Sequence, residues 1–305
     1  MTSSLVVNNL SKRFGDFIAV DNIDLELQPG EIFGLLGPNA AGKTTTIRML
    51  SGIIRPSGGT ANILGFDLFD DLESIKSRIG YVAQYFALYP ELTVTENLSF
   101  YSGIYGVDDA QRQTDLLEQY GLNQFADRYA GQLSGGYKRR LSMVCALCHD
   151  PELVFLDEPT AGIDPVTRKE LWDLFYELAM AGKTLFVTTH YMEEAERCHQ
   201  LAFLSHGKRV AQGTPDEIRR MLVHKQIYTF SAGKDMAMLK ALPRLEGVDL
   251  INRFGNSIRV VADDSLTLEK LAGFLADWPG EEYEPVQTTA NLEDVFITLT
   301  SGEPS

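Results

Sequence analysis

A glycine-bracketed segment between an apolar run and a helical pattern constrains this chain more than any other feature. The apolar run covers residues 32–36, and the segment reads Gly37-Pro38-Asn39-Ala40-Ala41-Gly42-Lys43-Thr44-Thr45. This spacing satisfies G-x-x-x-x-G-K-[ST], the pattern of a phosphate-binding loop that joins a buried strand to a helix. Such a loop aims backbone N–H groups at a phosphate, and the positive end of the following helix adds to the attraction. The sequence therefore predicts a nucleoside triphosphate site.

Four residues of this loop have separate roles in that prediction. Gly37 and Gly42 permit the backbone turns that bring several N–H groups to one side. Lys43 can reach the β- and γ-phosphates, and Thr44 offers a hydroxyl to Mg²⁺. The alternative is a glycine-rich loop that only turns the chain. The strand pattern before the loop and the helix pattern after it argue against that alternative.

The charge balance and the apolar runs limit the classes of partner. A formal net charge of −15 argues against nucleic acid as the main ligand, because neutralising phosphates requires clustered Lys and Arg. No apolar run approaches the length that crosses a bilayer, and the first residues lack the basic and apolar regions of a secretion signal. We therefore expect a cytosolic chain with no nucleic acid partner.

The cysteines form one short motif. Cys145 and Cys148 are spaced C-x-x-C, which is typical of redox and metal sites. They also lie in a helical pattern with Leu141 and Val144, at the spacing of a buried face. With no second pair of metal ligands nearby, we expect these thiols to pack in the core.

Apolar strand patterns alternate with helical patterns over residues 1–222. Buried strands are expected at 32–36, 79–82, 153–157 and 185–190, and this alternation predicts an α/β fold with a mostly parallel core sheet covered on both faces. Residues 5–28 alternate like two half-exposed strands, which predicts an antiparallel β edge. The stretch of about 86–150 has helical spacing throughout, so we expect a helical insert there.

A second domain is expected at residues 226–305, after a boundary near 222–226. Its predicted elements are a strand at 227–231, a helix at 235–242, strands at 248–253 and 257–262, a helix at 266–276, a strand at 283–288 and a helix at 292–299. Gly255-Asn256 is suited to turn the central hairpin. The βαββαβ order predicts a small ferredoxin-like α+β domain. We find no candidate site in it.

Polar residues follow the ends of the predicted core strands in a characteristic order. After the phosphate-binding loop come Gln84, then Leu133-Ser134-Gly135-Gly136, then Asp157-Glu158, then His190. Over roughly residues 4–222 this order resembles the nucleotide-binding subunit of ATP-binding cassette (ABC) transporters, and the Leu-Ser-Gly-Gly segment makes the resemblance specific. The resemblance implies a P-loop NTPase fold of the ABC cassette type that binds ATP and Mg²⁺.

The resemblance assigns roles to the residues at the strand ends. Asp157 is expected to hold Mg²⁺ together with Thr44 and Gln84, because a carboxylate at a strand end can bind the cation directly or through water. Glu158 resembles the family's general base. His190 resembles the histidine that contacts the γ-phosphate. Acids and histidines at strand ends are otherwise often structural or solvated.

The resemblance also implies a second ATPase subunit. Ser134, Gly135 and Gly136 are expected to close over the nucleotide of the other subunit in a head-to-tail homodimer or heterodimer. If this segment has no such role, the lysine and arginines that follow it would face the cytosol or a partner. The loop ending at Asp164 resembles the segment that crosses the dimer interface. Phe14 occupies the position of the family's adenine-stacking ring, although a purely structural Phe is a fair alternative.

Two residues depart from the family pattern. Ala40 stands where many members have glycine, which matters only if the backbone needs a positive φ there. Tyr137 replaces the glutamine that commonly follows Leu-Ser-Gly-Gly, and we interpret it as a mark of the subfamily. We expect a competent ATPase, because the residues that the family requires are present, namely Lys43, Asp157, Glu158 and His190.

The far end of the chain favours one branch of the family. The segments 292–297 and 191–198 resemble ATPases of bacterial ABC-2 type exporters. This implies a subunit at the cytoplasmic face of the membrane that drives export through a separate permease, with aromatic residues between Gln84 and Tyr105 as the coupling surface. The alternatives are a soluble ABC-type ATPase that acts as a nucleotide switch in assembly or repair, and an ATP-binding structural subunit. No residue indicates the transported substrate.

Overall fold

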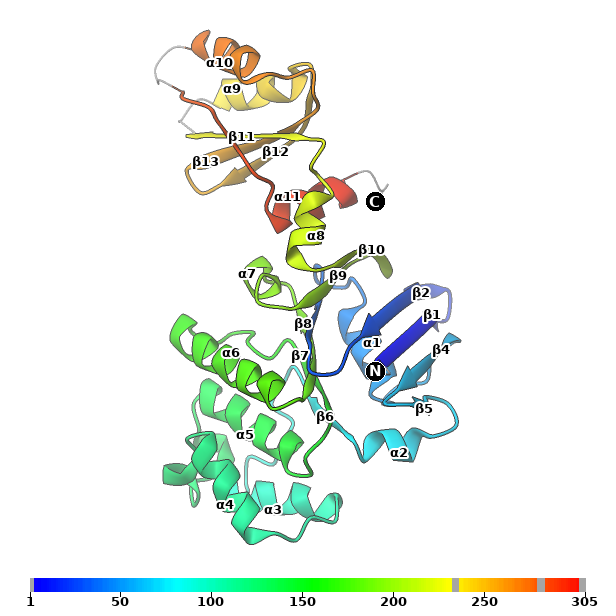
Figure 1. Cartoon of the computed structure of the whole chain (residues 1–305). Coiled ribbons are helices and arrows are strands. Elements are labelled where there is room, and N and C mark those ends of the chain that lie inside the picture. The colour runs from blue at the N-terminus through cyan, green and yellow to red at the C-terminus, as the bar shows by residue number, and fades with distance from the viewer. Residues whose placement is uncertain (1–2, 232–235, 279–282, 302–305) are drawn as a thin grey trace. The chain divides into compact units, whose positions relative to one another are not determined.

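The computed structural model describes residues 3–231, 236–278 and 283–301 (Figure 1). The chain divides into two compact units, Met1–Gln212 and Gly213–Ser305. The division therefore precedes the boundary that the sequence pattern suggests near 222–226. Within the described residues, no helix combines the length and apolar character that crossing a bilayer requires.

The first unit is built on a six-stranded sheet. Its order is β10-β9-β3-β8-β7-β6, and its strands are β10 (Lys208–Gly213), β9 (Gln200–Ser205), β3 (Ile32–Leu36), β8 (Thr184–Thr189), β7 (Leu153–Asp157) and β6 (Ile79–Val82). The neighbours from β9 to β6 pair in parallel. Every residue of β3, β7 and β8 is buried, as expected for parallel strands covered on both faces. The mostly parallel core sheet predicted from the sequence is confirmed.

A four-stranded antiparallel sheet covers one side of this core. Its order is β2-β1-β4-β5, with β2 (Phe17–Leu27), β1 (Leu5–Phe14), β4 (Gly58–Ile63) and β5 (Phe66–Asp67). Helix α1 (Lys43–Leu50) lies between the two sheets, because its Ile47 packs in one cluster with Val7 of β1 and Phe33 of β3. A short helix, α2 (Leu72–Lys76), borders the same cluster. The helix after the phosphate-binding loop is thereby fixed on both sides.

Helices cover the other face of the core sheet. They are α3 (Val94–Ile104), α4 (Ala110–Gln119), the 3-10 turns η1 (Asn123–Phe125) and η2 (Ala130–Gln132), α5 (Gly135–Leu147), α6 (Pro165–Met180) and α7 (Met192–Ala195). The predicted helical insert contains α3 to α5. Cys145 and Cys148 are buried in this layer, where desolvation raises the pKa of both thiols. Both cysteines pack in the apolar core as the helical spacing predicts.

The second unit contains its own antiparallel sheet and core. The sheet order is β12-β13-β11-β14, with β12 (Val248–Phe254), β13 (Ser257–Ala262), β11 (Gln226–Ser231) and β14 (Val286–Thr288). The helices are α8 (Pro215–Arg220), α9 (Met236–Ala241), the turn η3 (Leu242–Arg244), α10 (Leu268–Ala276) and α11 (Leu292–Thr300). From β11 to β14 the order is the predicted βαββαβ. Residue 235, the predicted start of the first helix, lies outside the described residues.

Candidate nucleotide site

The candidate residues meet because three parallel strands end at one edge of the sheet. In the register of the core sheet, Leu36 of β3 is the partner of Thr189 of β8, and Asp157 of β7 is the partner of Thr188. The loop after β3 therefore lies beside the acids that end β7 and the histidine that follows β8. Open α/β sheets bind ligands at this carboxyl edge.

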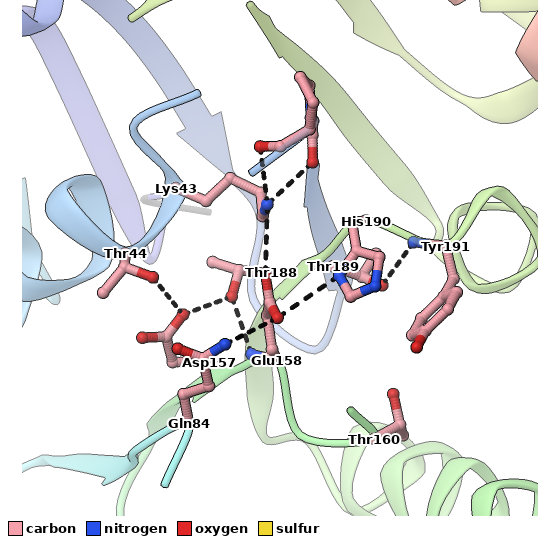
Figure 2. A network of polar contacts seen from close by, with 12 residues as sticks. Lys43, Thr44, Gln84, Asp157, Glu158, Thr160, Thr188, Thr189, His190 and Tyr191 are labelled. Atoms are coloured by element: carbon pink, nitrogen blue, oxygen red, sulfur yellow. Dashed lines mark hydrogen bonds and ion pairs between the residues drawn. The ribbon is translucent and has the colours of Figure 1, made fainter. Parts of the chain in front are cut away.

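Lys43 begins α1 directly after the loop and is almost fully buried. Its Nζ donates hydrogen bonds to the carbonyl oxygens of Gly37 (2.8 Å) and Pro38 (3.1 Å). The same nitrogen lies 3.2 Å from Oε1 of Glu158 (Figure 2). The loop carbonyls and the carboxylate thus hold the ammonium group where the loop closes on itself.

The backbone of the loop explains its glycines and its one departure from the family pattern. Gly42 has a φ of 106°, and a Cβ there would lie 2.5 Å from the carbonyl oxygen of Ala19. A Cβ at Gly37 would lie 2.3 Å from the carbonyl oxygen of Leu204. Ala40 has a φ of 66°, which is the left-handed region. The position does favour glycine, so Ala40 carries a strain of about 1 kcal/mol.

Asp157 is buried and only half satisfied. Its Oδ1 accepts hydrogen bonds from Oγ1 of Thr188 (2.7 Å) and Oγ1 of Thr44 (3.2 Å). Its Oδ2 is buried without a hydrogen-bond partner among the described residues. Burial is the main cause that raises the pKa of this carboxyl. A buried carboxylate oxygen with a free lone pair, next to a threonine hydroxyl, is the donor set that suits Mg²⁺.

Glu158 collects three of the predicted residues around one carboxylate. Besides Lys43, its Oε2 accepts a hydrogen bond from Nε2 of Gln84 (2.9 Å) and lies 3.4 Å from Nδ1 of His190 (Figure 2). Its backbone has a φ of 45°, and its N–H donates to Oγ1 of Thr188 (2.9 Å). Left-handed backbone at a non-glycine residue is costly and is concentrated at functional sites.

Arg139 fixes the segment that carries Gln84. Its guanidinium donates to the carbonyl oxygens of Ala83 (2.6 Å) and Gln84 (2.7 Å). The side chain is buried, and this desolvation lowers its pKa. Arg139 therefore does not face the cytosol or a partner, as the alternative interpretation of these basic residues would require. The sequence contains a weak signal for this burial, because Arg139 lies four residues before Met143, on the buried face of its helix.

A cavity of about 410 Å³ adjoins these residues. Its lining consists of Phe17, Ala19, the loop residues Asn39 to Thr45, Gln84, Tyr85 and Glu158. Phe14 is not part of this lining. It is half exposed, with the Lys12 ammonium 5.0 Å from its ring centre, and it pairs with Phe17 across the hairpin. The sequence does not predict Phe17 and Ala19 as lining residues, although Phe17 is recognisable as the second aromatic residue of that hairpin. Tyr85, which is expected on the coupling surface, also lines the cavity.

The remaining predicted residues lie outside this lining. Ser134 is exposed at the start of α5 and makes no capping hydrogen bond with its side chain. Gly135 has no atom within 4 Å of where a Cβ would be. Asp164 caps α6 by accepting from the N–H groups of Val166 (3.1 Å) and Thr167 (3.0 Å). Hydrogen bonds from Thr167 hold the pKa of this carboxyl below its usual range.

Comparison with known proteins relates the sequence to one family. A family model described as "ABC transporter" matches residues 20–161. The Nod factor export ATP-binding protein I of Cupriavidus metallidurans is 37% identical, and the match covers 99% of each chain. The probable multidrug ABC transporter ATP-binding protein YbhF of Escherichia coli is 45% identical over 213 residues, which cover 69% of this chain but only 37% of YbhF.

Solved structures also resemble this chain in fold. A structure described as the ATP-binding subunit of an ABC transporter has a TM-score of 0.66 and 31% identity, covering 72% of this chain and 93% of its own. A dimeric ATP-binding cassette in a post-hydrolysis state, bound to ADP and Pi, has a TM-score of 0.64 and 27% identity, covering 69% of this chain and 98% of its own.

Proposed function

The chain belongs to the family of ABC transporter ATP-binding subunits, and on this premise we propose that it hydrolyses MgATP to drive export through a separate membrane permease. The convergence of Lys43, Gln84 and His190 on the carboxylate of Glu158 carries the catalytic part of this proposal. The export part rests on similarity, because a relative that this chain matches over 99% of its length is named an export ATP-binding protein.

The nucleotide is held by the loop and by the pocket beside it. Phosphate oxygens replace the carbonyl acceptors of Lys43, and the N–H groups of the loop surround the β-phosphate. Thr44, Gln84 and Asp157 would hold Mg²⁺, which would neutralise charge on the phosphate oxygens. The orphaned Oδ2 of Asp157 supports this assignment. Phe14 or its hairpin partner Phe17 offers a ring for adenine.

Hydrolysis is assigned to the residues around Glu158. Its carboxylate accepts the proton of the attacking water, and Gln84, already hydrogen-bonded to it, orients that water. His190 contacts the γ-phosphate from the end of β8. The distance of 3.4 Å between Nδ1 of His190 and Oε2 of Glu158 is long for a hydrogen bond, and such contacts tighten when the substrate is bound.

A complete site requires a second subunit. Ser134 and Gly135 present a hydroxyl and an unobstructed backbone at the start of a helix, which suits an anion. Neither they nor Gly136 line the cavity of their own chain. We assign them to the γ-phosphate of the nucleotide on a second ABC subunit, which is either an identical chain or a different one. Asp164 then lies in the loop that crosses the interface.

The coupling to a permease is assigned to the helical insert. The exposed apolar side chains there are Tyr85, Tyr89, Phe100, Ile104 and Tyr105. The rings of Tyr89 and Phe100 pack edge to face with their centres 5.0 Å apart. Exposed aromatic residues at this density are typical of a protein interface. A permease docked on this surface places the chain at the cytoplasmic face of the membrane.

The Glu158→Gln variant tests the proposal. We expect phosphate release to fall by roughly 10²- to 10⁴-fold while ATP binding is retained, because the amide cannot accept the proton. Glu152→Gln is the matched control, since Glu152 is an exposed acid just before the same strand, paired with Arg78. Full turnover in Glu158→Gln would refute the assignment of the base. A chain that stays monomeric in this variant at saturating MgATP would refute the shared site.

A further inference from the structure

A buried carboxylate that the proposed chemistry does not use lies behind His190. Glu194, in α7, has only 1% of its surface exposed. Its Oε1 accepts a hydrogen bond from Oγ1 of Thr160, and its Oε2 accepts one from Oγ1 of Thr189 at 2.6 Å. The Nε of Arg168 lies 3.8 Å from Oε1. The buried carboxylate of Glu194 therefore links three segments of the chain, which contain Thr160, Arg168 and Thr189.

Two of these segments flank the proposed catalytic pair. Thr160 follows Glu158 by two residues and begins the loop that leads to Asp164. Thr189 directly precedes His190, and its Oγ1 also accepts the N–H of Tyr191 at 3.0 Å. Figure 2 shows Thr189 and Tyr191 beside His190, and Thr160 on the neighbouring segment. His190 thus lies in the chain between Thr189 and Tyr191, and the Thr189 hydroxyl links both of these residues to Glu194.

Arg168 connects the same two segments a second time. Its Nη2 donates to the carbonyl oxygen of Ile163 at 3.4 Å, in the loop before Asp164. Its guanidinium lies 4.6 Å from the ring centre of Tyr191, whose ring lies 4.0 Å from that of His190. Burying a carboxylate is costly, and two hydroxyl donors with a nearby cation offset that cost. The resulting network has a defined geometry.

We propose that Glu194 is a positioning residue for ATP hydrolysis. It holds the segment of His190 against Glu158 and ties this placement to the loop 161–164. Contact of that loop with a second subunit is thereby transmitted to the histidine. The inference rests on the function proposed above for His190 and for the loop. It adds a connection within one chain between the subunit interface and the proton-accepting carboxylate.

Near-isosteric substitutions cut the two links separately. Thr160→Val removes the link to the loop, and Thr189→Val removes the link to His190. We expect each to lower kcat for ATP roughly tenfold, the scale of one hydrogen bond to a charged group, with KM unchanged within about twofold. Thr184→Val is the matched control, because Thr184 is a buried threonine at the other end of the same strand, β8. It is expected to leave kcat unchanged.

A double-mutant cycle separates positioning from a structural role. In a His190→Ala background, Thr189→Val should cause no further loss, because the residue it positions is gone. An equal tenfold loss in that background would overturn the inference. Full kcat in His190→Ala alone would instead refute the role proposed for His190. If only Thr189→Val lowers kcat, transmission from the loop is overturned.

The serine variants provide the rescue. Thr160→Ser and Thr189→Ser keep the hydroxyl and should keep kcat within about twofold, whereas a loss equal to that of valine would overturn the inference. Thermal unfolding is measured for every variant. If a valine variant does not fold, Glu194→Gln replaces it, and unchanged kcat in a folded Glu194→Gln would overturn the positioning role.

Discussion

Replacing Arg139 with methionine should both destabilise the first unit and slow ATP hydrolysis. The methionine fills similar space but leaves the carbonyl oxygens of Ala83 and Gln84 without their donors. Both hydrogen bonds are short, at 2.6 and 2.7 Å, and their donor is charged. The segment that presents Gln84 to Glu158 loses its attachment to α5.

The magnitude follows from these two bonds. A hydrogen bond to a charged group contributes about 1.5 to 3 kcal/mol, so the pair is worth about 3 to 6 kcal/mol before desolvation is counted. Burial of the guanidinium opposes this gain, as the lowered pKa of Arg139 shows. We expect a net loss of about 2 to 4 kcal/mol in the free energy of unfolding. Misplacing Gln84 should lower kcat on the order of ten- to hundredfold.

Tryptophan fluorescence during urea unfolding measures the first unit separately. The chain has two tryptophans, and Trp172 is fully buried in the same cluster as the apolar face of α5. A Trp278→Phe background leaves Trp172 as the reporter. Lys169→Met is the control, because Lys169 is exposed and its ion pair is with the exposed Asp173 on the same helix. Such a pair is worth less than about 1 kcal/mol. Equal losses in both variants, or unchanged hydrolysis in Arg139→Met, would refute the reasoning.

Three further predictions concern the loop and the metal site. Ala40→Gly should raise the thermal midpoint slightly or leave it unchanged, because about 1 kcal/mol of relieved strain is partly offset by the greater freedom of glycine in the unfolded chain; a large fall in differential scanning calorimetry would contradict this. Gly42→Ala should abolish nucleotide binding in a fluorescent-ATP titration, because its Cβ would lie 2.5 Å from a carbonyl oxygen; ordinary affinity would show that the loop adapts. Since burial raises the pKa of Asp157, the native state holds this proton more tightly than the unfolded state does. The contribution of Asp157 to the free energy of unfolding therefore falls as the pH rises from the ordinary pKa of an aspartate to the raised pKa of Asp157. The affinity for Mg²⁺ should rise over the same pH range. A Mg²⁺ titration of Asp157→Asn that shows the same pH dependence would contradict this prediction.

The sequence predicts the scaffold of the site well because that scaffold depends on local patterns. Apolar runs place three strands in a parallel sheet, and Asp157 and His190 follow the ends of two of them. The phosphate-binding loop needs only its own spacing and its flanking elements. The sequence shows that Ala40 stands where glycine is common, but whether its φ is positive is known only from the folded backbone, where it is 66°.

The residues that the sequence does not predict act through contacts between distant segments. Arg139 reaches carbonyl groups 55 and 56 residues earlier in the chain. The sequence pattern places Thr188 in a buried strand and indicates no further role for it. In the structure its hydroxyl contacts both Asp157 and the backbone of Glu158. Phe17 lines the cavity because of the hairpin that pairs it with Phe14. No spacing rule reveals these partners before the strands are assembled.

The register of the core sheet makes this site sensitive to the number of residues in each strand as well as to the residue types. Asp157 and Thr188 are partners in the pairing of β7 with β8, and both strands are buried along their whole length. Deleting one residue within β7 would bring Glu158 opposite Thr188 and reverse which side chains face each layer of the core. Substitutions can therefore accumulate in these strands while insertions and deletions are confined to the loops. In a diverging lineage, strand length should change later than the residues that the strands carry.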